Sequence, residues 1–312
     1  MSLKDSCIIG LEIKMSNLEV QLGKLKLKNP VILASGTFDR SITQKIDVNK
    51  LGGLVTKTIT LNPREGNPIP HIIKTKYGWL NSVGIKNPGI KEYLKNELPF
   101  WQKFQTIIIT SIGGETEKEY TELTTRLNDS NVKVIEVNVS CPNIDQGGMG
   151  FGTNAKTLFR LTSKIRKVYK NILIVKISPN VKDIVTIAKS TLDAGADIVS
   201  LTNTYLALEI DNKKKRPLLF RKVGGYSGGA IKPISLRMVW EVYNKLRCPI
   251  IGGGGIEDFS DALDYIMVGA SAIAIGSANY LNPQLSVKII TSFEKYFQRN
   301  KIKKINQIRG TI

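Results

Sequence analysis

A cysteine between two asparagines stands at the end of one apolar segment of this chain. Cys141 follows residues 134–139, which are mostly apolar and β-branched, and Asn138 and Asn143 lie on either side of it. Most free cysteines are small buried hydrophobes that fill space. A thiol at the exit of a buried strand, between two carboxamides, can also exchange protons with a substrate. Both interpretations are open from this segment alone.

Lysines close two other apolar segments at the corresponding place. Lys57 directly follows residues 54–56, and Lys176 ends residues 172–176. An ordinary surface lysine lays its stem over apolar surface and keeps its ammonium group in water. The recurrence of lysine at the same place in two segments favours a pair of fixed cations, which would suit an electron-rich ring or a phosphate.

Carboxamides and glycines supply the other polar features. Each asparagine taken singly is most often a turn former. The four that stand at segment ends or in long loops predict a planar ligand such as a pyrimidine-like ring, because an amide offers a donor beside an acceptor. They are Asn81, Asn138, Asn143 and Asn203. Glycine-rich stretches at 252–255, 276–277 and 224–229 are either tight turns or loops whose N–H groups hold a phosphate.

Apolar and amphipathic segments alternate along the chain. The strand-like segments are 31–34, 54–56, 106–110, 134–138, 172–176, 198–201, 250–252 and 272–275. The segments with apolar residues at helical spacing are 42–51, 90–104, 116–127, 155–169, 184–193, 235–246, 259–268 and 285–298. Eight strand–helix units with apolar strands predict an α/β protein of the (β/α)8 TIM-barrel class, in which loops after strands seven and eight frequently hold a phosphate.

Three segments add to this barrel. Residues 18–27 predict a small N-terminal β-hairpin with Gly23 near its turn. The connections 58–89 and 202–233 are too long for turns and leave the C-terminal ends of predicted strands. Long connections of this kind are usually lids or binding loops, so we expect them over the active face.

Composition excludes several classes of protein. Apolar residues make up 42% of the 312 residues, and no uncharged run approaches the roughly 18 residues of a membrane helix. The N-terminus has no secretory signal pattern, so a cytoplasmic protein is expected. Residues 1–14 are either a native extension or added sequence, and no linker divides 15–312, which we interpret as one domain.

Motifs for metal or hydrolytic chemistry are absent. Three cysteines without a C-x-x-C pair indicate a reducing compartment and no cysteine-built metal or iron–sulfur site. No metal is therefore expected. The sequence has no G-x-S-x-G, H-E-x-x-H or G-K-[ST] motif. The single histidine, His71, is given no catalytic role.

The net charge of +19 permits two interpretations. It could mark a surface for nucleic acid or another acidic partner. It could also reflect lysines spread over solvated helix faces, with clusters only at 213–216 and 301–304. No RNA-binding signature accompanies the lysines, so we favour the second interpretation and expect no nucleic-acid partner. Phosphate ligands and an acidic protein partner are secondary explanations.

Several of these segments, in this order, resemble the class 1 dihydroorotate dehydrogenases, the soluble flavoenzymes of pyrimidine synthesis. The likeness runs from Met15 to about Ile290. It is carried by Ala34-Ser35-Gly36-Thr37-Phe38, Lys57-Thr58-Ile59-Thr60, Leu80-Asn81-Ser82-Val83-Gly84, Asn87-Pro88-Gly89, Asn138-Val139-Ser140-Cys141-Pro142-Asn143, Val175-Lys176-Ile177-Ser178-Pro179-Asn180, Asn203-Thr204, Gly225-Tyr226-Ser227-Gly228, Lys232-Pro233 and residues 252–255. The loop 147–153 is similar to that of subclass 1B, and the membrane-bound class has serine in place of Cys141.

The resemblance implies an FMN cofactor, dihydroorotate as substrate, orotate as product and Cys141 as the catalytic base. It places the substrate against Lys57, Asn81, Ser82, Val83, Gly84, Ile85, Asn138, Asn143, Asn203 and Thr204. It places FMN against Ser35, Gly36, Lys57, Thr58, Ser111, Asn138, Lys176, Ser200, Gly228, Gly254, Gly255, Gly276 and Ser277. Three residues depart from the family pattern without removing a catalytic group: Ser111 stands for asparagine, Gly229 for proline and Asp39 for glycine.

The subclass 1B likeness further implies a partner subunit that carries FAD and an iron–sulfur cluster, with NAD as final acceptor. The assembly would be a homodimer core or a heterotetramer. A fumarate-reducing subclass 1A enzyme is one alternative. An FMN-dependent tRNA dihydrouridine synthase is another, favoured by the charge but opposed by the short stretch after the eighth unit, which leaves no helical RNA-binding domain.

Overall fold

Eight short apolar strands form the centre of the protein. A computed structural model describes residues 17–139 and 151–312. Its parallel strands close into a barrel in chain order: β3 (Val31–Leu33), β4 (Gly53–Val55), β7 (Ile107–Ile112), β8 (Val134–Asn138), β9 (Ile172–Lys176), β10 (Ile198–Leu201), β15 (Ile250–Gly253) and β16 (Ala272–Ile275). The last strand pairs with the first, with Ala274 opposite Ile32. The predicted (β/α)8 class is confirmed.

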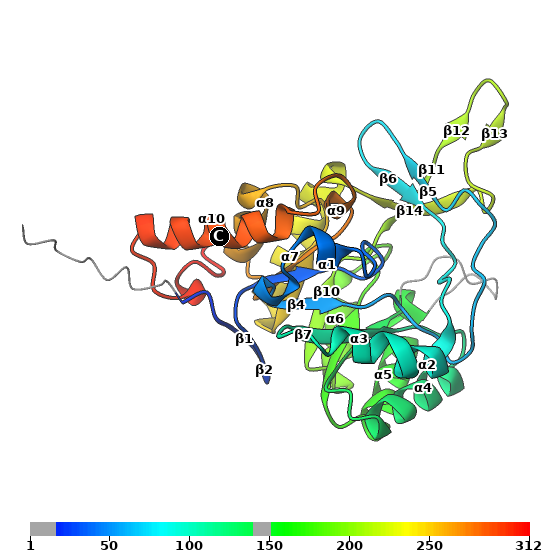
Figure 1. The fold of residues 1–312 in the computed structure, drawn as a ribbon, viewed down its shortest axis with the longest axis horizontal. Helices are drawn as coiled ribbons and strands as arrows, with labels where there is room; N and C mark the ends of the chain where they lie inside the picture. The colour runs from blue at the N-terminus through cyan, green and yellow to red at the C-terminus, as the bar shows by residue number, and fades with distance from the viewer. Residues whose placement is uncertain (1–16, 140–150) are drawn as a thin grey trace, which may run out of the picture.

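Helices follow the strands and surround the barrel (Figure 1). They are α1 (Ile42–Lys45), η1 (Val48–Lys50), α2 (Gly89–Glu92), η2 (Tyr93–Glu97), α3 (Leu98–Trp101), α4 (Glu117–Asp129), η3 (Phe151–Thr153), α5 (Ala155–Val168), α6 (Ile184–Asp193), η4 (Gly229–Ile231), α7 (Lys232–Leu246), α8 (Phe259–Met267), α9 (Ala278–Leu281), α10 (Leu285–Arg299) and η5 (Ile305–Gln307). Nearly all side chains of the barrel strands are buried, either in the barrel interior or against this layer of helices. Within 17–139 and 151–312, no helix has the length and apolar character needed to cross a membrane.

Side chains at the helix N-termini explain where several helices begin. The Thr116 hydroxyl accepts a hydrogen bond from the Glu119 N–H at the start of α4. The Asp183 carboxylate accepts from two N–H groups of α6, and Asp258 forms a capping box with Asp261 at α8. Each cap satisfies N–H groups that have no partner within the helix.

Two predicted helices are not continuous. The helix expected over 42–51 ends at Lys45, and the Asp47 side chain then caps the separate 3-10 turn η1. The helix expected over 90–104 contains the π-helical turn η2 between α2 and α3. Helix α7 begins three residues earlier than the predicted start at 235, with a proline in its first turn, where its missing N–H is not needed.

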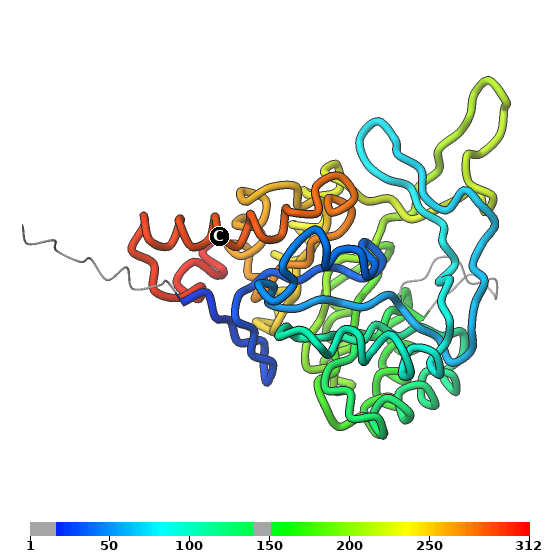
Figure 2. The backbone as a smooth tube through the Cα atoms, in the orientation of Figure 1, coloured from blue at the N-terminus to red at the C-terminus, as the bar shows by residue number. Residues whose placement is uncertain are grey.

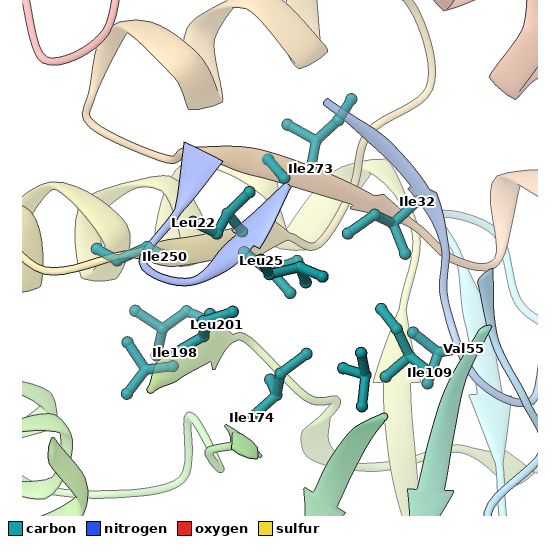
Figure 3. Close-up of a cluster of buried hydrophobic side chains, with 14 of the residues drawn as sticks. Leu22, Leu25, Ile32, Val55, Ile109, Ile174, Ile198, Leu201, Ile250 and Ile273 are labelled. Carbon is teal, nitrogen blue, oxygen red and sulfur yellow. The ribbon is translucent and has the colours of Figure 1, made fainter. Parts of the chain in front are cut away.

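The predicted hairpin, β1 (Val20–Leu22) and β2 (Leu25–Leu27), closes the N-terminal end of the barrel. Gly23 in its turn has φ +57° and lies against the residues that immediately precede β10 and β15. Leu22 and Leu25 of the hairpin lie among buried side chains of the barrel strands, as Figure 3 shows. The hairpin therefore covers the N-terminal end of the barrel, opposite the C-terminal ends of its strands.

The two long connections contain strands that the sequence did not predict. The first carries β5 (Ile72–Lys74) and β6 (Trp79–Asn81), and the second carries β11 (Tyr205–Leu208) and β14 (Val223–Ser227). They form one antiparallel sheet in the order β11-β14-β6-β5. An arm, β12 (Ile210–Asp211) and β13 (Arg216–Pro217), projects beyond it (Figure 1). The cyan and yellow-green excursions run side by side in Figure 2, over the same side of the barrel.

Candidate active site

The C-terminal ends of the barrel strands and the four-stranded sheet enclose a cavity of about 430 Å³. The C-terminal ends of all the strands of a TIM barrel lie at one face, so residues that are distant in the chain meet there. Eighteen of the predicted residues line the cavity: Ser35, Gly36, Lys57, Thr58, Asn81, Val83, Gly84, Ile85, Asn138, Lys176, Ser200, Asn203, Thr204, Gly228, Gly254, Gly255, Gly276 and Ser277. The polar and glycine residues that were predicted at separate strand ends therefore line one cavity.

Two of the predicted residues that the structure describes, Ser82 and Ser111, are not in this wall. Ser111 is fully buried behind it, and its hydroxyl lies 2.9 Å from the Thr58 hydroxyl. Ser82 is also buried, with its hydroxyl accepting a hydrogen bond from the Asn67 side chain. Ser111 therefore supports the cavity residue Thr58 from behind. Cys141 and Asn143 lie outside the described residues.

A chain of amide and hydroxyl groups crosses the floor of the cavity. Asn203 Nδ2 donates to Asn138 Oδ1 at 3.1 Å, and Asn138 Nδ2 is 3.4 Å from the Thr58 hydroxyl oxygen. The Tyr120 hydroxyl donates to the backbone carbonyl oxygen of Asn138 from the outer helix layer. The two side-chain contacts fix which end of the Asn138 amide donates and which accepts, so the floor presents hydrogen-bonding groups in one defined arrangement.

The four-stranded sheet holds the opposite wall. Asn81 ends β6 and donates through Nδ2 to the Gly225 carbonyl oxygen at 2.9 Å. A Cβ at Gly225 would lie 2.2 Å from the Thr204 hydroxyl oxygen, and one at Gly224 would lie 2.6 Å from the Asn81 carbonyl oxygen. These two glycines therefore allow β14 to pass close to two predicted substrate contacts. Gly224 and Gly225 form part of a strand, and only Ser227 and Gly228 of the stretch 224–229 reach the cavity, so a phosphate contact stays a prediction at that end of the stretch.

Lys57 provides a cation at the cavity wall with an altered acidity. Partial burial lowers the pKa of its ammonium group, and the positive charge of Lys86 lowers it further, while Asp39 acts in the opposite direction. Desolvation disfavours the charged form of any buried ammonium group. An anionic ligand beside Lys57 would therefore find a cation whose charge is poorly compensated by protein groups.

A buried carboxylate lies in the interior of the barrel beneath the cavity. Glu136 on β8 is 2% exposed, and its Oε1 has no hydrogen-bond partner among the described residues. Burial raises the pKa of this carboxyl group, while the charge of Lys176 and the hydroxyl group of Ser200 oppose the increase. Both of these neighbours line the cavity. Glu136 therefore adds a negative charge, or a proton, directly behind the predicted flavin contacts.

Glycine loops leave β15 and β16 at the third side of the cavity. Gly254 and Gly255 have φ values of +125° and +72°, which favour glycine. A Cβ at Gly255 would lie 2.8 Å from the Lys232 backbone nitrogen, so the loop must approach α7 closely. Among the described residues other than its chain neighbours, only Thr37 would lie within 4 Å of a Cβ at Gly276. The backbone around Gly276 is thus accessible to a ligand that needs N–H donors.

The cavity wall also contains residues that the sequence did not indicate. They include Thr37, His71, Ile72, Trp79, Thr202, Ile231, Glu257 and Tyr280. Trp79 and Tyr280 pack edge to face at 5.3 Å, and the Tyr280 hydroxyl donates to the Gly36 carbonyl oxygen. The Glu257 carboxylate accepts from the Gly229 N–H. Thr37, inside the motif 34–38, and Trp79, next to the motif with Asn81, carried sequence signals that could have indicated them.

Comparison with known proteins identifies the family. The family model described as dihydroorotate dehydrogenase matches residues 17–297. The chain belongs to the dihydroorotate dehydrogenase family. As a dihydroorotate dehydrogenase it is an oxidoreductase of pyrimidine biosynthesis that acts on dihydroorotate, and the family is flavin-dependent. No cluster of three or more metal-ligating side chains occurs in 17–139 and 151–312.

Three relatives carry the name "Dihydroorotate dehydrogenase B (NAD(+)), catalytic subunit". The protein from Thermoanaerobacter pseudethanolicus is 45% identical over 298 residues, which cover 95% of this chain and 99% of that protein. The protein from Desulforamulus reducens is 45% identical over 301 residues, covering 94% and 98%. The protein from Bacteroides fragilis is 42% identical over 301 residues, covering 96% and 99%. This dihydroorotate dehydrogenase is thus similar to these catalytic subunits along nearly its whole length.

Proposed function

We propose that this dihydroorotate dehydrogenase uses FMN to oxidise (S)-dihydroorotate to orotate and passes the electrons to NAD through a partner subunit. The observation that carries the proposal is the single cavity that brings together two lysines, an amide floor and two glycine loops. The name shared by the relatives, with its NAD(+) and its catalytic subunit, supports the subclass.

The residues of the cavity fit FMN in three respects. The glycine loops after β15 and β16 offer accessible backbone donors to a phosphate group, with Gly254, Gly255, Gly276 and Ser277 as the proposed contacts. Lys57 and Lys176 would hold the electron-rich edge of the flavin ring. Thr58, Asn138 and Ser200 would supply hydrogen bonds from the floor. When bound, the flavin supplies the acceptor for the two electrons that leave the substrate.

The protein's own residues would orient the substrate and take its proton. Asn81, Asn138, Asn203 and Thr204 present donors and acceptors that match the carbonyl and N–H groups of a dihydropyrimidine ring. Cys141 would remove the proton at C5 while the C6–H bond loses its electron pair, leaving a double bond between C5 and C6. An ordinary thiol has a pKa of about 8.5, so turnover should rise with pH.

The proposed role of Cys141 is tested by a single-turnover measurement. Purified protein should be yellow and should lose its colour when dihydroorotate is added without oxygen. In Cys141→Ala, flavin reduction should slow by roughly 10²- to 10⁴-fold, because a general base contributes that much. Cys248→Ala is the matched control, since Cys248 is a buried thiol outside the cavity wall. An unchanged rate in Cys141→Ala would refute the assignment.

The electron acceptor is tested separately. Co-purification of a second chain that contains FAD and an iron–sulfur cluster, together with NAD-linked activity, would support the proposed route. Reduction of fumarate by the isolated chain would instead indicate a subclass 1A enzyme. The family match disfavours a tRNA dihydrouridine synthase, and a colourless protein that binds no FMN would contradict the whole proposal.

A further inference from the structure

Asn87 is a buried side chain that uses all of its hydrogen-bonding groups without lining the cavity. It is 6% exposed and lies in the turn between the cavity wall at 83–85 and helix α2. Its Oδ1 accepts from the backbone N–H groups of Thr60 at 3.1 Å and Gly89 at 2.9 Å. Its Nδ2 donates to the Thr60 hydroxyl at 2.8 Å and to the Ile85 carbonyl oxygen at 2.7 Å. One amide therefore joins three backbone segments.

The segment at Thr60 is itself fixed to the barrel. The Ile59 N–H donates to the Ser111 carbonyl oxygen, and the Gly113 N–H donates to the Ile59 carbonyl oxygen, both at 2.9 Å. Asn87 and Arg64 exchange two further backbone hydrogen bonds. The first long connection, which carries β5, β6 and residues 83–85, thus begins and ends beside Thr60. Asn87 holds its two ends together there.

Residues 83–85 need this support because their backbone is strained. Ile85 has φ +53° and follows Gly84, which has φ +71°. A left-handed conformation is rare for a β-branched residue and persists only where neighbouring contacts enforce it. The Asn87 amide holds the carbonyl group of Ile85 itself. Both Gly84 and Ile85 line the cavity, beside Asn81.

We propose that Asn87 is a positioning residue for the substrate, which holds the left-handed turn at Gly84 and Ile85 so that this wall faces the ligand in a fixed conformation. The inference rests on the proposed function, because it concerns the same substrate site. Asn87 does not touch the cavity and acts only through Ile85 and the ends of the first long connection. Its loss should weaken substrate and product binding and leave the flavin loops after β15 and β16 unchanged.

The test measures orotate binding to FMN-loaded protein by calorimetry, beside FMN content and the melting temperature. Asn87→Asp keeps the acceptor oxygen and removes the N–H donors to Ile85 and Thr60. Asn87→Ala removes the acceptor as well as the donors. We expect about 10-fold weaker orotate binding in each, with FMN content unchanged. Asn29→Ala is the matched control, because Asn29 is also buried and bonds the Lys50 carbonyl oxygen and the Val31 N–H near the opposite end of the barrel. It should lower the melting temperature comparably and leave orotate binding unchanged.

A double-mutant cycle separates positioning from a general loss of stability. Glycine at position 85 adopts the left-handed turn without strain, so Asn87→Asp should weaken orotate binding less in an Ile85→Gly background than in the wild type. An equal loss in both backgrounds, or unchanged orotate binding in Asn87→Asp and Asn87→Ala, would overturn the inference. If Asn87→Ala does not fold, Asn87→Asp and Thr60→Val decide. Wild-type protein that binds FMN but not orotate would contradict the proposed function instead.

Discussion

Replacing Glu136 by glutamine should stabilise this protein at neutral pH. Glu136 is 2% exposed inside the barrel, and its Oε1 has no hydrogen-bond partner in the part of the chain that the structure describes. Burial raises the pKa of its carboxyl group above the ordinary value near 4.5, against the opposing effects of Lys176 and Ser200. The folded protein therefore holds this proton more tightly than the unfolded chain does, and ionisation costs stability.

The direction of the pH effect follows from proton binding. Between the carboxyl pKa of the unfolded chain and the raised pKa of the folded protein, only the unfolded chain has released the proton, so stability falls as the pH rises. Glutamine has the same shape and no proton to release. The advantage of Glu136→Gln should therefore be small below about pH 4.5 and complete above the folded pKa. A buried polar group without a partner costs about 1–3 kcal/mol, and more when it is charged. Glutamine keeps a polar atom without a partner, so the substitution removes only the cost of the charge. We expect a gain of about 1–3 kcal/mol, which corresponds to a melting temperature roughly 2–6 °C higher for a chain of this size.

The assay is thermal unfolding of the two proteins side by side from about pH 5 to about pH 8, because their difference cancels all other titrating groups. Glu122→Gln is the control, since Glu122 is half-exposed in an ion pair with Arg126, and it should change stability by less than about 0.5 kcal/mol. The reasoning is refuted if Glu136→Gln melts below the wild type by the same amount at every pH. That result would mean that the carboxylate is better satisfied inside the barrel than its contacts indicate.

Two further substitutions test the proposed phosphate loops and the positive charge near Lys57. Gly255→Ala places a Cβ at 2.8 Å from the Lys232 backbone nitrogen at a φ of +72°, so we expect a folded protein that loses FMN on gel filtration, and retention of FMN at the wild-type level would contradict the proposed loop. Lys86→Gln removes the one positive charge that lowers the pKa of Lys57 among the described residues, and it makes the electrostatic potential near the cavity less positive. The KM for the dihydroorotate anion should then rise about 2- to 5-fold at low salt and depend less on ionic strength. A KM with unchanged salt dependence would exclude this electrostatic role.

Features set by local sequence pattern were predictable. Each barrel strand is a short apolar run, and its position was predicted to within about two residues because β-branched runs bounded by turns have few other solutions. The hairpin with Gly23 was predicted for the same reason. The position of the cavity was also predictable, because the C-terminal ends of the strands of a TIM barrel lie at one face. Residues at these ends, such as Lys57 and Asn138, could therefore be grouped before their geometry was known.

Features set by long-range contacts were not predictable. The strands β5 and β11 are too short to show a period, and each pairs within its own connection, β5 with β6 and β11 with β14. The sheet is completed only by the pairing of β6 with β14, which lie far apart in the chain. Trp79 and Tyr280 meet across about two-thirds of the chain, so no local pattern links them. The burial of Ser111 behind Thr58 likewise depends on the β4–β7 side of the barrel and not on the motif that contains it.

The glycines of β14 show how the two long connections came to form one wall. A glycine-rich stretch in a loop resembles a phosphate site, but Gly224 and Gly225 face Asn81 and Thr204 across distances that exclude any side chain. Their function is thus to let β14 lie against β6, where the Gly225 carbonyl oxygen accepts from the Asn81 amide. Because Asn81 comes from the first connection and Thr204 from the second, neither could be placed correctly by its own loop. This wall of the cavity, which we propose to bind the substrate, is therefore a property of the paired sheet, and its precision depends on two positions that carry no side chain.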